Sequence, residues 1–540
     1  MTRLTALERE IFDAIIVGGG MAGAGVAREL ALRGLSCVLI EKGDFASGTT
    51  SRSSKLIHGG LRYLELRDFA LVRESLRERE TLARLAPHLV RPLPFLVPVY
   101  QGGTRNLIKV RIGLRLYDLL TPGKRTERYR TLGRAEALAM EPTLRPQDLL
   151  GAGYYFDDLL LSPERLCLEN VLAARRAGAH ALNYAQAEEF RPRPGGGWAV
   201  RVRDLVGSDV LTVTGRMLVN ATGPWVDRVR ELAGIWEKGT RLVRTTKGAH
   251  LVLPRLTDRA VYLSTHDDRM VFVIPWRDFS LVGTTDTDFD DSPDRVWATP
   301  DDVAYLLAET RRVLPDPRVT EANIVYTYAG IRPLTYEVGK RASAVSRQHR
   351  VIAEGPDEGF LSITGTKLTC FRSLAQRVGD EIARRLGKGG ASRTARLALD
   401  GSDEEAGALE VRAWLDVTEA VRASGLEPGQ VEALTATYGR RASAVLDLAR
   451  RLPGGTERLC KSAPDIVAQL HWAVETELTV SLQDFLLRRT GIGTGPCLGL
   501  DCAAGVAQRM GALLGWSPRR IEAELNAYHA VVRQGLRFRQ

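Results

Sequence analysis

A run of hydroxyl, glycine and basic residues between Thr49 and Tyr63 has the side chains to act on an extended, phosphate-bearing molecule. Its first half, up to Ser54, supplies hydroxyl and backbone N–H groups that can donate hydrogen bonds to phosphate oxygens. Its second half contains His58, two glycines and Arg62. A neutral imidazole can accept a proton near pH 7, and a guanidinium can hold an anion through two hydrogen bonds. The run therefore predicts a site that binds phosphate and moves a proton.

The residues before this run have the spacing of a dinucleotide-binding turn, Gly18-x-Gly20-x-x-Gly23. Gly18 permits a tight turn, Gly20 lets the backbone approach a pyrophosphate, and Gly23 lets a helix pack on a strand. The N–H groups at the start of that helix attract phosphate. Glu41 ends the next predicted strand, where its carboxylate can accept hydrogen bonds from ribose hydroxyls. This much predicts either NAD or FAD.

Two later motifs favour FAD. An apolar strand turns sharply at Asn220-Ala-Thr-Gly-Pro-Trp225, and a strand-to-helix turn is predicted at Gly365–Arg372. The backbone N–H groups of the second turn can meet the edge of a reduced isoalloxazine, where negative charge develops. FAD is therefore the predicted cofactor.

The predicted elements bring these motifs to the ends of strands. Asp13–Val17 and Ser36–Ile40 are short apolar runs suited to buried parallel strands, with a helix over Met21–Arg33 between them. This unit opens a doubly wound sheet. Charge pairs at i,i+4 spacing predict another helix over Phe69–Leu85.

A second, more antiparallel sheet is predicted between the dinucleotide-binding segments, and mixed sheets of this kind usually hold a substrate. Its strand-like stretches are Trp198–Val202, Met217–Asn220, His250–Leu253, Met270–Pro275 and Ser280–Thr284.

At 540 residues the chain is long enough for two or more domains. Glycines loosen the chain near Leu386–Asp400, and the remainder reads as amphipathic helices. We therefore divide the chain into an FAD-dependent unit, 1–390, and an all-α domain, 400–540. Within the first unit, the FAD-binding segments are about 10–100, 150–240 and 325–390, and the substrate segments are about 100–150 and 240–325.

The net charge of +10 is compatible with an anionic substrate, an anionic membrane surface or nucleic acid. With 6% aromatic residues and no contiguous basic groove that contains stacking residues, nucleic acid is not expected. The segment Leu107–Leu120 interleaves apolar residues with Lys109, Arg111 and Arg115, and Arg105 precedes it. It predicts either a surface that lies on an anionic bilayer or a core-facing element with a charged outer side.

No metal site is expected from the cysteines. Of the six, Cys497 and Cys502 are the only close pair, and their spacing matches no common zinc signature. Residues Met1–Phe12 lack the apolar stretch of a signal peptide, and no run approaches the roughly 18 apolar residues that span a membrane. We therefore expect free thiols and a cytoplasmic protein that can still attach to the inner face of the cell membrane.

The sequence resembles the respiratory, FAD-dependent glycerol-3-phosphate dehydrogenase family along nearly its whole length. Ser53-Ser-Lys-Leu-Ile-His-Gly-Gly-Leu-Arg-Tyr-Leu-Glu65 is the most specific match. Asp13–Gly34, Asn220–Trp225, Tyr328-Ala-Gly-Ile-Arg-Pro-Leu334 and Gly365–Arg372 also match. The chain departs from the family pattern at Thr366, Phe371 and Ser162-Pro-Glu164, which puts its subtype and local geometry in question.

The resemblance implies an α/β fold of the glutathione-reductase-like or D-amino-acid-oxidase-like type. It combines a Rossmann-like FAD-binding domain, an interleaved mixed β-sheet substrate domain and a C-terminal all-α domain. The implied reaction is oxidation of sn-glycerol 3-phosphate to dihydroxyacetone phosphate by hydride transfer from C2 to flavin N5. The implied acceptor is quinone, with peripheral membrane attachment. A homodimer is compatible with the family but does not follow from the sequence.

Other functions remain open at this stage. An oxidase with the same chemistry would pass electrons to O₂ and release hydrogen peroxide. An amino-acid oxidase would need a carboxylate clamp, and a purely structural flavoprotein would give no reason to pair arginines with histidines.

The implied reaction needs a base for the hydroxyl proton and a cationic clamp for the phosphate. His58 and His250 are the candidate bases, and an arginine that polarises the hydroxyl while water takes the proton is a third possibility. The predicted catalytic residues are His58, His250, Arg332 and Lys367. The predicted substrate-binding residues are Arg62, Tyr63, Lys247 and Arg332. The predicted FAD-binding residues are Gly18, Gly20, Met21, Ala22, Gly23, Glu41, Lys42, Thr49, Thr50, Ser51, Ser53, Ser54, Lys55, Ala187, Ala221, Thr222, Gly223, Trp225, Gly365, Lys367, Leu368 and Thr369.

Overall fold

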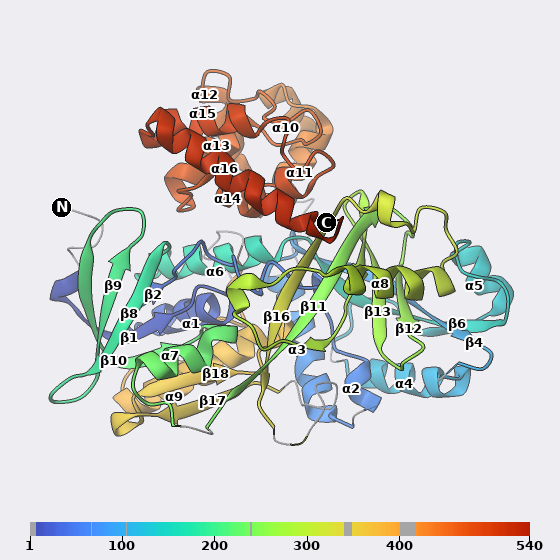
Figure 1. Ribbon diagram of the computed structural model, residues 1–540, viewed down its shortest axis with the longest axis horizontal. Coiled ribbons are helices and arrows are strands. Elements are labelled where there is room, and N and C mark those ends of the chain that lie inside the picture. Colours follow the sequence, from blue (N-terminus) through green and yellow to red (C-terminus); the bar gives the residue numbers. More distant parts are fainter. Residues whose placement is uncertain are drawn as a thin grey trace.

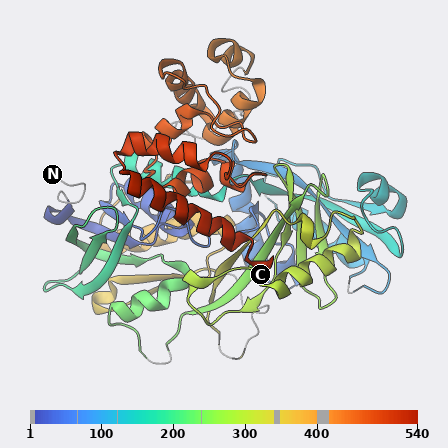
Figure 2. The ribbon, with the colours of Figure 1, turned by 45° about the horizontal axis from the view of Figure 1, so that its top comes forward.

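The computed structural model describes residues 7–539, except 66, 104, 122, 238–239, 338, 340–347 and 400–416. Two β-sheets lie along the long axis of the molecule, and a group of helices packs above them (Figures 1 and 2). The predicted start of the helical domain, residue 400, lies outside the described residues. The helical group is described from residue 417 onward.

The first sheet contains eight strands among the described residues, and its central strands run parallel in the order β18-β10-β1-β2-β7. The strands are β1 Ile11–Val17, β2 Cys37–Ile40, β7 His180–Leu182, β8 Ala185–Pro192, β9 Trp198–Asp204, β10 Val210–Asn220, β17 Arg350–Glu354 and β18 Phe360–Thr364. The predicted strand–helix–strand unit is confirmed by β1, helix α1 (Met21–Leu32) and β2. This is the doubly wound arrangement that the sequence predicted.

Helix α1 is buried on nearly all sides because it lies between the first sheet and two other helices, α6 (Pro163–Arg176) and α9 (Phe371–Leu386). A helix in such a position has to be apolar or small all round. The glycine and alanine residues of α1 meet this requirement. A Cβ on Gly25, for example, would come within 2.9 Å of the Phe371 ring.

The second sheet contains ten strands among the described residues and is mostly antiparallel. They are β3 Leu56–Ile57, β4 Val90–Tyr100, β5 Arg130–Gly133, β6 Leu149–Leu160, β11 Val243–Pro254, β12 Ala260–Ser264, β13 Met270–Trp276, β14 Phe279–Gly283, β15 Thr287–Asp288 and β16 Tyr326–Thr335. Strands β4, β6 and β16 fall mainly in ranges that the sequence assigned to FAD-binding segments.

The prediction was wrong for two strands of the second sheet. Trp198–Val202 lies in β9 and Met217–Asn220 in β10, and both belong to the first sheet. The cause is that β10 pairs in parallel with β1, about two hundred residues earlier, while β9 pairs with β10. Alternation within a stretch identifies a strand but not its partners.

The remaining helices of the first unit flank the two sheets. They are α2 Arg62–Glu65, α3 Phe69–Leu85, α4 Leu107–Leu119, α5 Arg134–Met140, α7 Val226–Leu232 and α8 Pro300–Val313. Helix α3 has the predicted bounds. Helix α8 packs on the second sheet and begins with a capping box between Thr299 and Asp302.

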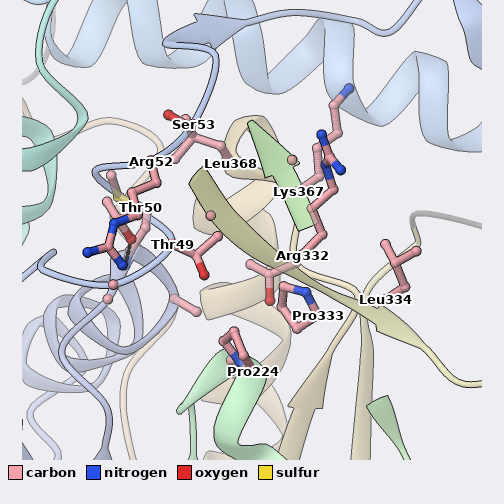
Figure 3. Close-up of a pocket in the computed structure, with 18 of the residues that line it drawn as sticks. Thr49, Thr50, Arg52, Ser53, Pro224, Arg332, Pro333, Leu334, Lys367 and Leu368 are labelled. Atoms are coloured by element: carbon pink, nitrogen blue, oxygen red, sulfur yellow. Dashed lines mark hydrogen bonds between the residues drawn. The ribbon is translucent and has the colours of Figure 1, made fainter. Parts of the chain in front are cut away.

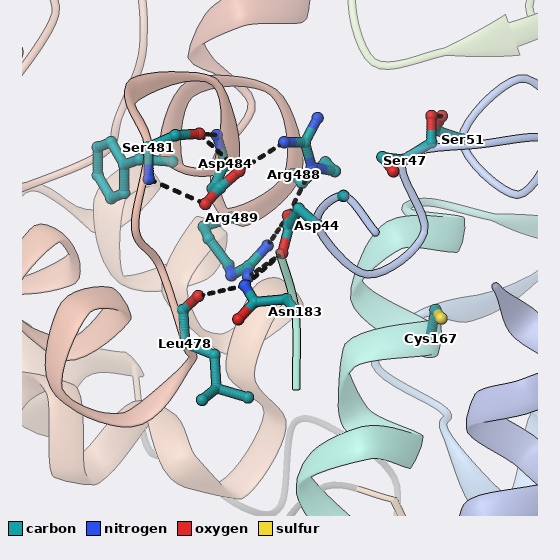
Figure 4. A network of polar contacts seen from close by, with 12 residues as sticks. Asp44, Ser47, Ser51, Cys167, Asn183, Leu478, Ser481, Asp484, Arg488 and Arg489 are labelled. Atoms are coloured by element: carbon teal, nitrogen blue, oxygen red, sulfur yellow. Dashed lines mark hydrogen bonds and ion pairs between the residues drawn. The ribbon is translucent and has the colours of Figure 1, made fainter. Parts of the chain in front are cut away.

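The helical group has cores of its own and docks on the first unit through a buried ion network (Figure 4). The carboxylate of Asp44 accepts hydrogen bonds from Arg489 Nη1 at 2.8 Å and Arg488 Nε at 2.6 Å. Asn183 Nδ2 reaches the Leu478 carbonyl oxygen at 2.8 Å. The helical elements are α10 Val417–Ser424, α11 Pro428–Tyr438, α12 Ala442–Arg451, α13 Val467–Thr476, α14 Leu482–Asp484, the π-helical turn η10 Phe485–Arg489, α15 Ala503–Leu514 and α16 Pro518–Gly535.

Candidate active site

A cavity of about 1340 Å³ lies between the two sheets. The carboxyl ends of β1, β2 and β10 line one part of it, and residues of β11, β13 and β16 line another. Side chains from the hydroxyl-rich run Thr49–Tyr63, from β16 and from the turn at Lys367 face one another across it (Figure 3). The crevice at the carboxyl ends of parallel strands is the usual ligand site of such folds.

The dinucleotide-binding turn has the close contacts that its glycines predicted. Gly18 has a positive φ of 106°, and a Cβ there would lie 2.7 Å from the Ala221 oxygen. A Cβ on Gly23 would overlap the Gly18 oxygen. The Met21 N–H donates to Thr50 Oγ1 at 3.0 Å, which ties the start of α1 to the hydroxyl-rich run. A cradle that only glycine can form fits a pyrophosphate at the helix N-terminus.

Glu41 follows β2 and lines the same cavity. Its Oε2 accepts from the Gly19 N–H at 2.6 Å and its Oε1 from the Gly43 N–H at 2.7 Å. Burial raises the pKa of this carboxyl, and the two N–H donors work in the opposite direction. These bonds fix the carboxylate at the strand end, where it can receive ribose hydroxyls.

Lys42, Trp225 and Asp294 also line this part of the cavity and contact one another. Lys42 Nζ pairs with Asp294 at 2.8 Å and lies 4.4 Å from the centre of the Trp225 ring. The indole Nε1 of Trp225 also donates to Asp294, at 3.2 Å. Lys42 and Trp225 were predicted from sequence, and Asp294 was not.

A buried network of hydrogen bonds supports the turn that carries His58. The Gly59 N–H donates to Asp157 Oδ1 at 3.2 Å, and the same carboxylate accepts from Tyr117 at 2.7 Å and Arg79 at 2.8 Å. Lys367 Nζ donates to the His58 carbonyl oxygen at 2.8 Å and to Ser75 Oγ at 2.8 Å. Lys367 therefore belongs both to the cavity wall and to the support of this turn.

The His58 ring faces the cavity without a hydrogen-bond partner among the residues that the structure describes. Burial, together with the charges of Lys367 and Arg79, holds its pKa well below the usual value. The imidazole is therefore neutral at pH 7 and has a nitrogen lone pair to offer. Its ring meets Phe272 edge-on, with 6.5 Å between the ring centres.

His250 of β11 also lines the cavity, but its ring already contacts two other side chains. Its Nε2 lies 2.8 Å from Ser54 Oγ, and its ring stacks on Tyr328 with 4.7 Å between the ring centres. Burial and the charges of Arg332 and Lys55 lower its pKa to about 3. These contacts indicate that the His250 ring supports the hydroxyl-rich run at Ser54.

Of the arginines that line the cavity, Arg332 and Arg62 differ in their hydrogen bonding. Arg332 Nη1 donates to Asp286 at 3.0 Å and its Nη2 to Thr284 Oγ1 at 2.9 Å, in the space left by Gly248. Arg62, the first residue of α2, is half-buried and forms no hydrogen bond or ion pair within the described part of the chain. An unpaired guanidinium at a cavity wall is a binding site for an anion.

Five of the predicted residues do not line this cavity. Lys247 points to the opposite face of β11 from Gly248 and His250, where its Nζ pairs with Asp302 at 2.6 Å. Lys55 is buried, with its Nζ 3.6 Å from Glu164 and 3.4 Å from the Ser51 carbonyl oxygen. Gly23, Ser51 and Thr369 lie behind the wall and support it.

The remaining predicted residues all line the cavity. They are Gly18, Gly20, Met21, Ala22, Glu41, Lys42, Thr49, Thr50, Ser53, Ser54, His58, Arg62, Tyr63, Ala187, Ala221, Thr222, Gly223, Trp225, His250, Arg332, Gly365, Lys367 and Leu368.

Several cavity residues were missed by the sequence reasoning. Arg52 lies inside the hydroxyl-rich run (Figure 3), and Asp286 lies two residues after the predicted strand Ser280–Thr284. Arg52 stands between two predicted residues and Asp286 lies close to a predicted strand, so their positions were usable signals. Arg269, Tyr262 and Phe272 come from the second sheet and its turns, and no local pattern marks them.

Comparison with known proteins gives the class. Residues 13–369 match the model of the FAD dependent oxidoreductase family, and residues 392–521 match the C-terminal domain of alpha-glycerophosphate oxidase. The glycine cradle, the fixed Glu41 carboxylate and a cavity that continues to a basic wall fit FAD. The chain is an FAD-dependent oxidoreductase.

Its relatives narrow the class further. The chain is 36% identical to a glycerol-3-phosphate dehydrogenase from Synechocystis sp., over 99% of this chain and 98% of that one. It is 34% identical to the aerobic glycerol-3-phosphate dehydrogenase of Staphylococcus aureus, over 96% and 93%. The structure of a Bacillus halodurans glycerol-3-phosphate dehydrogenase complexed with FAD matches with a TM-score of 0.82 and 28% identity, over 98% and 96%. The chain belongs to the glycerol-3-phosphate dehydrogenase family.

Proposed function

We propose that this enzyme oxidises sn-glycerol 3-phosphate to dihydroxyacetone phosphate and passes the electrons to a membrane quinone. One observation carries the proposal. The side chains of Arg62 and His58, four residues apart in sequence, line the FAD cavity without hydrogen-bond partners among the described residues. One can bind a phosphate and the other can accept a proton. The names of the Synechocystis and Staphylococcus relatives support the same activity.

FAD, when bound, supplies the acceptor for the hydride that leaves C2 of the substrate. Arg62 holds the phosphate through two charge-assisted hydrogen bonds, with Tyr63 beside it. His58 takes the proton of the C2 hydroxyl, so that the hydride leaves as the carbonyl forms. We assign this role to His58 rather than His250 because His250 Nε2 is bonded to Ser54.

The other cavity residues orient the substrate and limit access of water. Arg332 is neutralised in part by Asp286, so it contributes hydrogen bonds more than net charge. Tyr155, Tyr262 and Phe272 give the wall near His58 an aromatic surface. A mainly aromatic wall strengthens the electrostatic contacts of the few polar groups that face it.

The substrate assignment can be tested by mixing the yellow protein with sn-glycerol 3-phosphate in the absence of air and following the flavin absorption. We expect rapid bleaching, and colour that returns much faster with a quinone analogue than with air. Fast return in air with peroxide release would identify an oxidase instead. A flavin band that never bleaches would exclude this substrate.

Helix α4 offers the surface for peripheral membrane attachment. Ile108, Ile112 and Leu119 are 64%, 61% and 81% exposed, and their spacing puts them on one side of the helix. Lys109, Arg111 and Arg115 are exposed beside them. Apolar side chains flanked by basic ones favour an anionic bilayer surface. No helix in the described part of the chain is long and apolar enough to cross a membrane.

Replacing Ile108 and Ile112 together by serine should weaken binding to anionic vesicles about a hundredfold, because each isoleucine contributes roughly 1.5 kcal/mol or more on burial. Co-sedimentation with vesicles measures this. The matched control is the pair Leu205→Ser and Val206→Ser, which removes exposed apolar side chains from the β9–β10 turn at the other end of the molecule. Equal losses for both pairs would contradict the proposed surface.

Lys367 should give the reaction a limit at alkaline pH. Burial lowers the pKa of its ammonium group to about 8, so the charge is present below this pH and lost above it. We expect kcat/KM for the anionic substrate to fall about tenfold as the pH rises through this range, since the cavity loses a positive charge. Lys367→Arg should remove this limb because arginine stays protonated. An unchanged limb in the variant would assign it to another group.

A further inference from the structure

Three thiols and a carboxylate converge within the helical group, far from the FAD cavity. Cys460 lies between α12 and α13, whereas Cys497, Asp501 and Cys502 lie in the turn before α15. Cys460 Sγ is 3.5 Å from Cys497 Sγ and 3.4 Å from Asp501 Oδ1. The ligand atoms of Cys460, Asp501 and Cys502 all lie within 4.8 Å of one another. No zinc spacing is visible along the chain because Cys460 is distant in sequence from the other three residues.

Two of these separations match the edges of a metal coordination tetrahedron, and Cys497 joins the group through its contact with Cys460. Zinc binds sulfur at about 2.3 Å and carboxylate oxygen at about 2.0 Å, so neighbouring ligand atoms lie roughly 3.5–3.8 Å apart. The measured 3.5 Å and 3.4 Å are close to these values. Thiolate ligands select soft or borderline metals such as zinc over calcium or magnesium.

The turn that carries three of the four groups is fixed by its surroundings. Tyr528 OH donates to the Leu498 carbonyl oxygen at 2.6 Å, and Gly499 next to it has a positive φ of 68°. Cys502 is the N-cap residue of α15, a twelve-residue helix, and its Sγ lies 3.5 Å from the Gly499 carbonyl oxygen. The Ser462 hydroxyl donates to Cys497 Sγ at 3.0 Å, as the outer hydrogen bonds of metal ligands commonly do.

We propose that Cys460, Cys497, Cys502 and Asp501 bind one zinc ion. Three thiols release three protons to solvent as three Zn–S bonds form, and Asp501, already ionised, completes the coordination without a redox change. A disulfide would use two of the three thiols and leave the third, with the carboxylate, unexplained. The compact spacing of the ligand atoms also argues against an iron–sulfur cluster, whose ligands surround two or more iron atoms.

The position of the site indicates a structural role. The ion would join the loop after α12 to the turn before α15 across the core of the helical group. Gly491 and Thr494, just before this turn, accept hydrogen bonds from Arg277 of the second sheet, at 3.2 and 2.9 Å. The metal would therefore stiffen the part of the helical group that contacts the first unit.

Elemental analysis of the purified full-length flavoprotein tests the proposal. We expect one zinc per chain, and strong loss of zinc in Cys497→Ser. Asp501→Asn changes an exposed side chain and should fold normally while it binds zinc at least tenfold more weakly. Cys37→Ala, which removes a thiol from β2, is the matched control and should keep the metal.

A spectroscopic measurement separates binding from folding. Cobalt added to the zinc-depleted protein should give the absorption of a tetrahedral thiolate site, at wavelengths longer than the flavin bands. This absorption should disappear in Cys497→Ser while the flavin spectrum stays. Iron with acid-labile sulfide, a Cys460–Cys497 disulfide, or equal zinc content in the Cys497→Ser variant would each overturn the proposal.

Discussion

Replacing Arg62 by leucine is expected to lower kcat/KM for sn-glycerol 3-phosphate about a thousandfold. A charged, partly buried hydrogen-bonding partner is worth about 2–5 kcal/mol to a ligand, and 4 kcal/mol corresponds to roughly three orders of magnitude. The protein itself should stay folded, because Arg62 pairs with no carboxylate in the described part of the chain. Arg332 differs, since its removal would break its ion pair with Asp286.

Two comparisons make the Arg62 result specific for phosphate binding. Arg62→Lys keeps the charge but loses the two-pronged geometry, so its kcat/KM should lie between those of the wild type and Arg62→Leu. Glycerol lacks the phosphate, and its slow oxidation should be nearly the same in all three proteins. An equal loss with glycerol would mean that Arg62 supports the fold of the site. A loss below about threefold with sn-glycerol 3-phosphate would contradict the clamp.

The glycine cradle could be predicted from sequence because its requirements are local. Gly18, Gly20 and Gly23 lie in one strand–turn–helix unit. Helix α1 begins at Met21, directly after Gly20, and a Cβ on Gly23 would overlap the Gly18 oxygen of the same unit. The same holds for Glu41, which ends the next strand of that unit. Such features need only the backbone geometry of neighbouring residues.

Lys247 illustrates a prediction that the sequence could have corrected. It is three residues from His250, and successive residues of a strand point to opposite faces, so residues three apart do as well. Once both are assigned to β11, they cannot line one cavity. The sequence did not indicate whether the side chain of Lys247 or that of His250 points to the cofactor, because this depends on the register between β11 and β16.

Lys55 and the cysteine cluster depend on contacts between distant segments. Lys55 lies inside the most specific motif, but its ammonium group pairs with Glu164 of α6 and therefore does not line the cavity. Cys460 reaches Cys497 because α13, which follows Cys460, packs on α15, which follows Cys497. Spacing rules describe sites that are built from one local segment. The Lys55 pair and the cysteine cluster are instead built from segments that are distant in sequence.

Asp44→Asn should destabilise the protein by about 3–5 kcal/mol, which is the usual cost of leaving buried charges without their partner. The Asp44 side chain is fully buried, and it faces Arg489 and Arg488, whose side chains are 1% and 10% exposed. The change should also loosen the helical group, because this network is part of its docking surface (Figure 4). Chemical unfolding measures the first effect, and limited proteolysis that releases the helical group measures the second.

The acid behaviour of the same ion network provides an independent check. Burial alone raises the pKa of Asp44, but the guanidinium groups of Arg489 and Arg488 outweigh it and lower this pKa to about 2. Its contribution to stability is therefore complete above the ordinary carboxyl pKa, about 3.9, and is lost as the pH falls through about 2. The difference between wild type and Asp44→Asn should shrink over that interval. Asp447→Asn removes an exposed pair with Arg450 and should change stability by less than about 1 kcal/mol. A similar small change for Asp44→Asn would mean that apolar packing, and not these charges, holds the helical group in place.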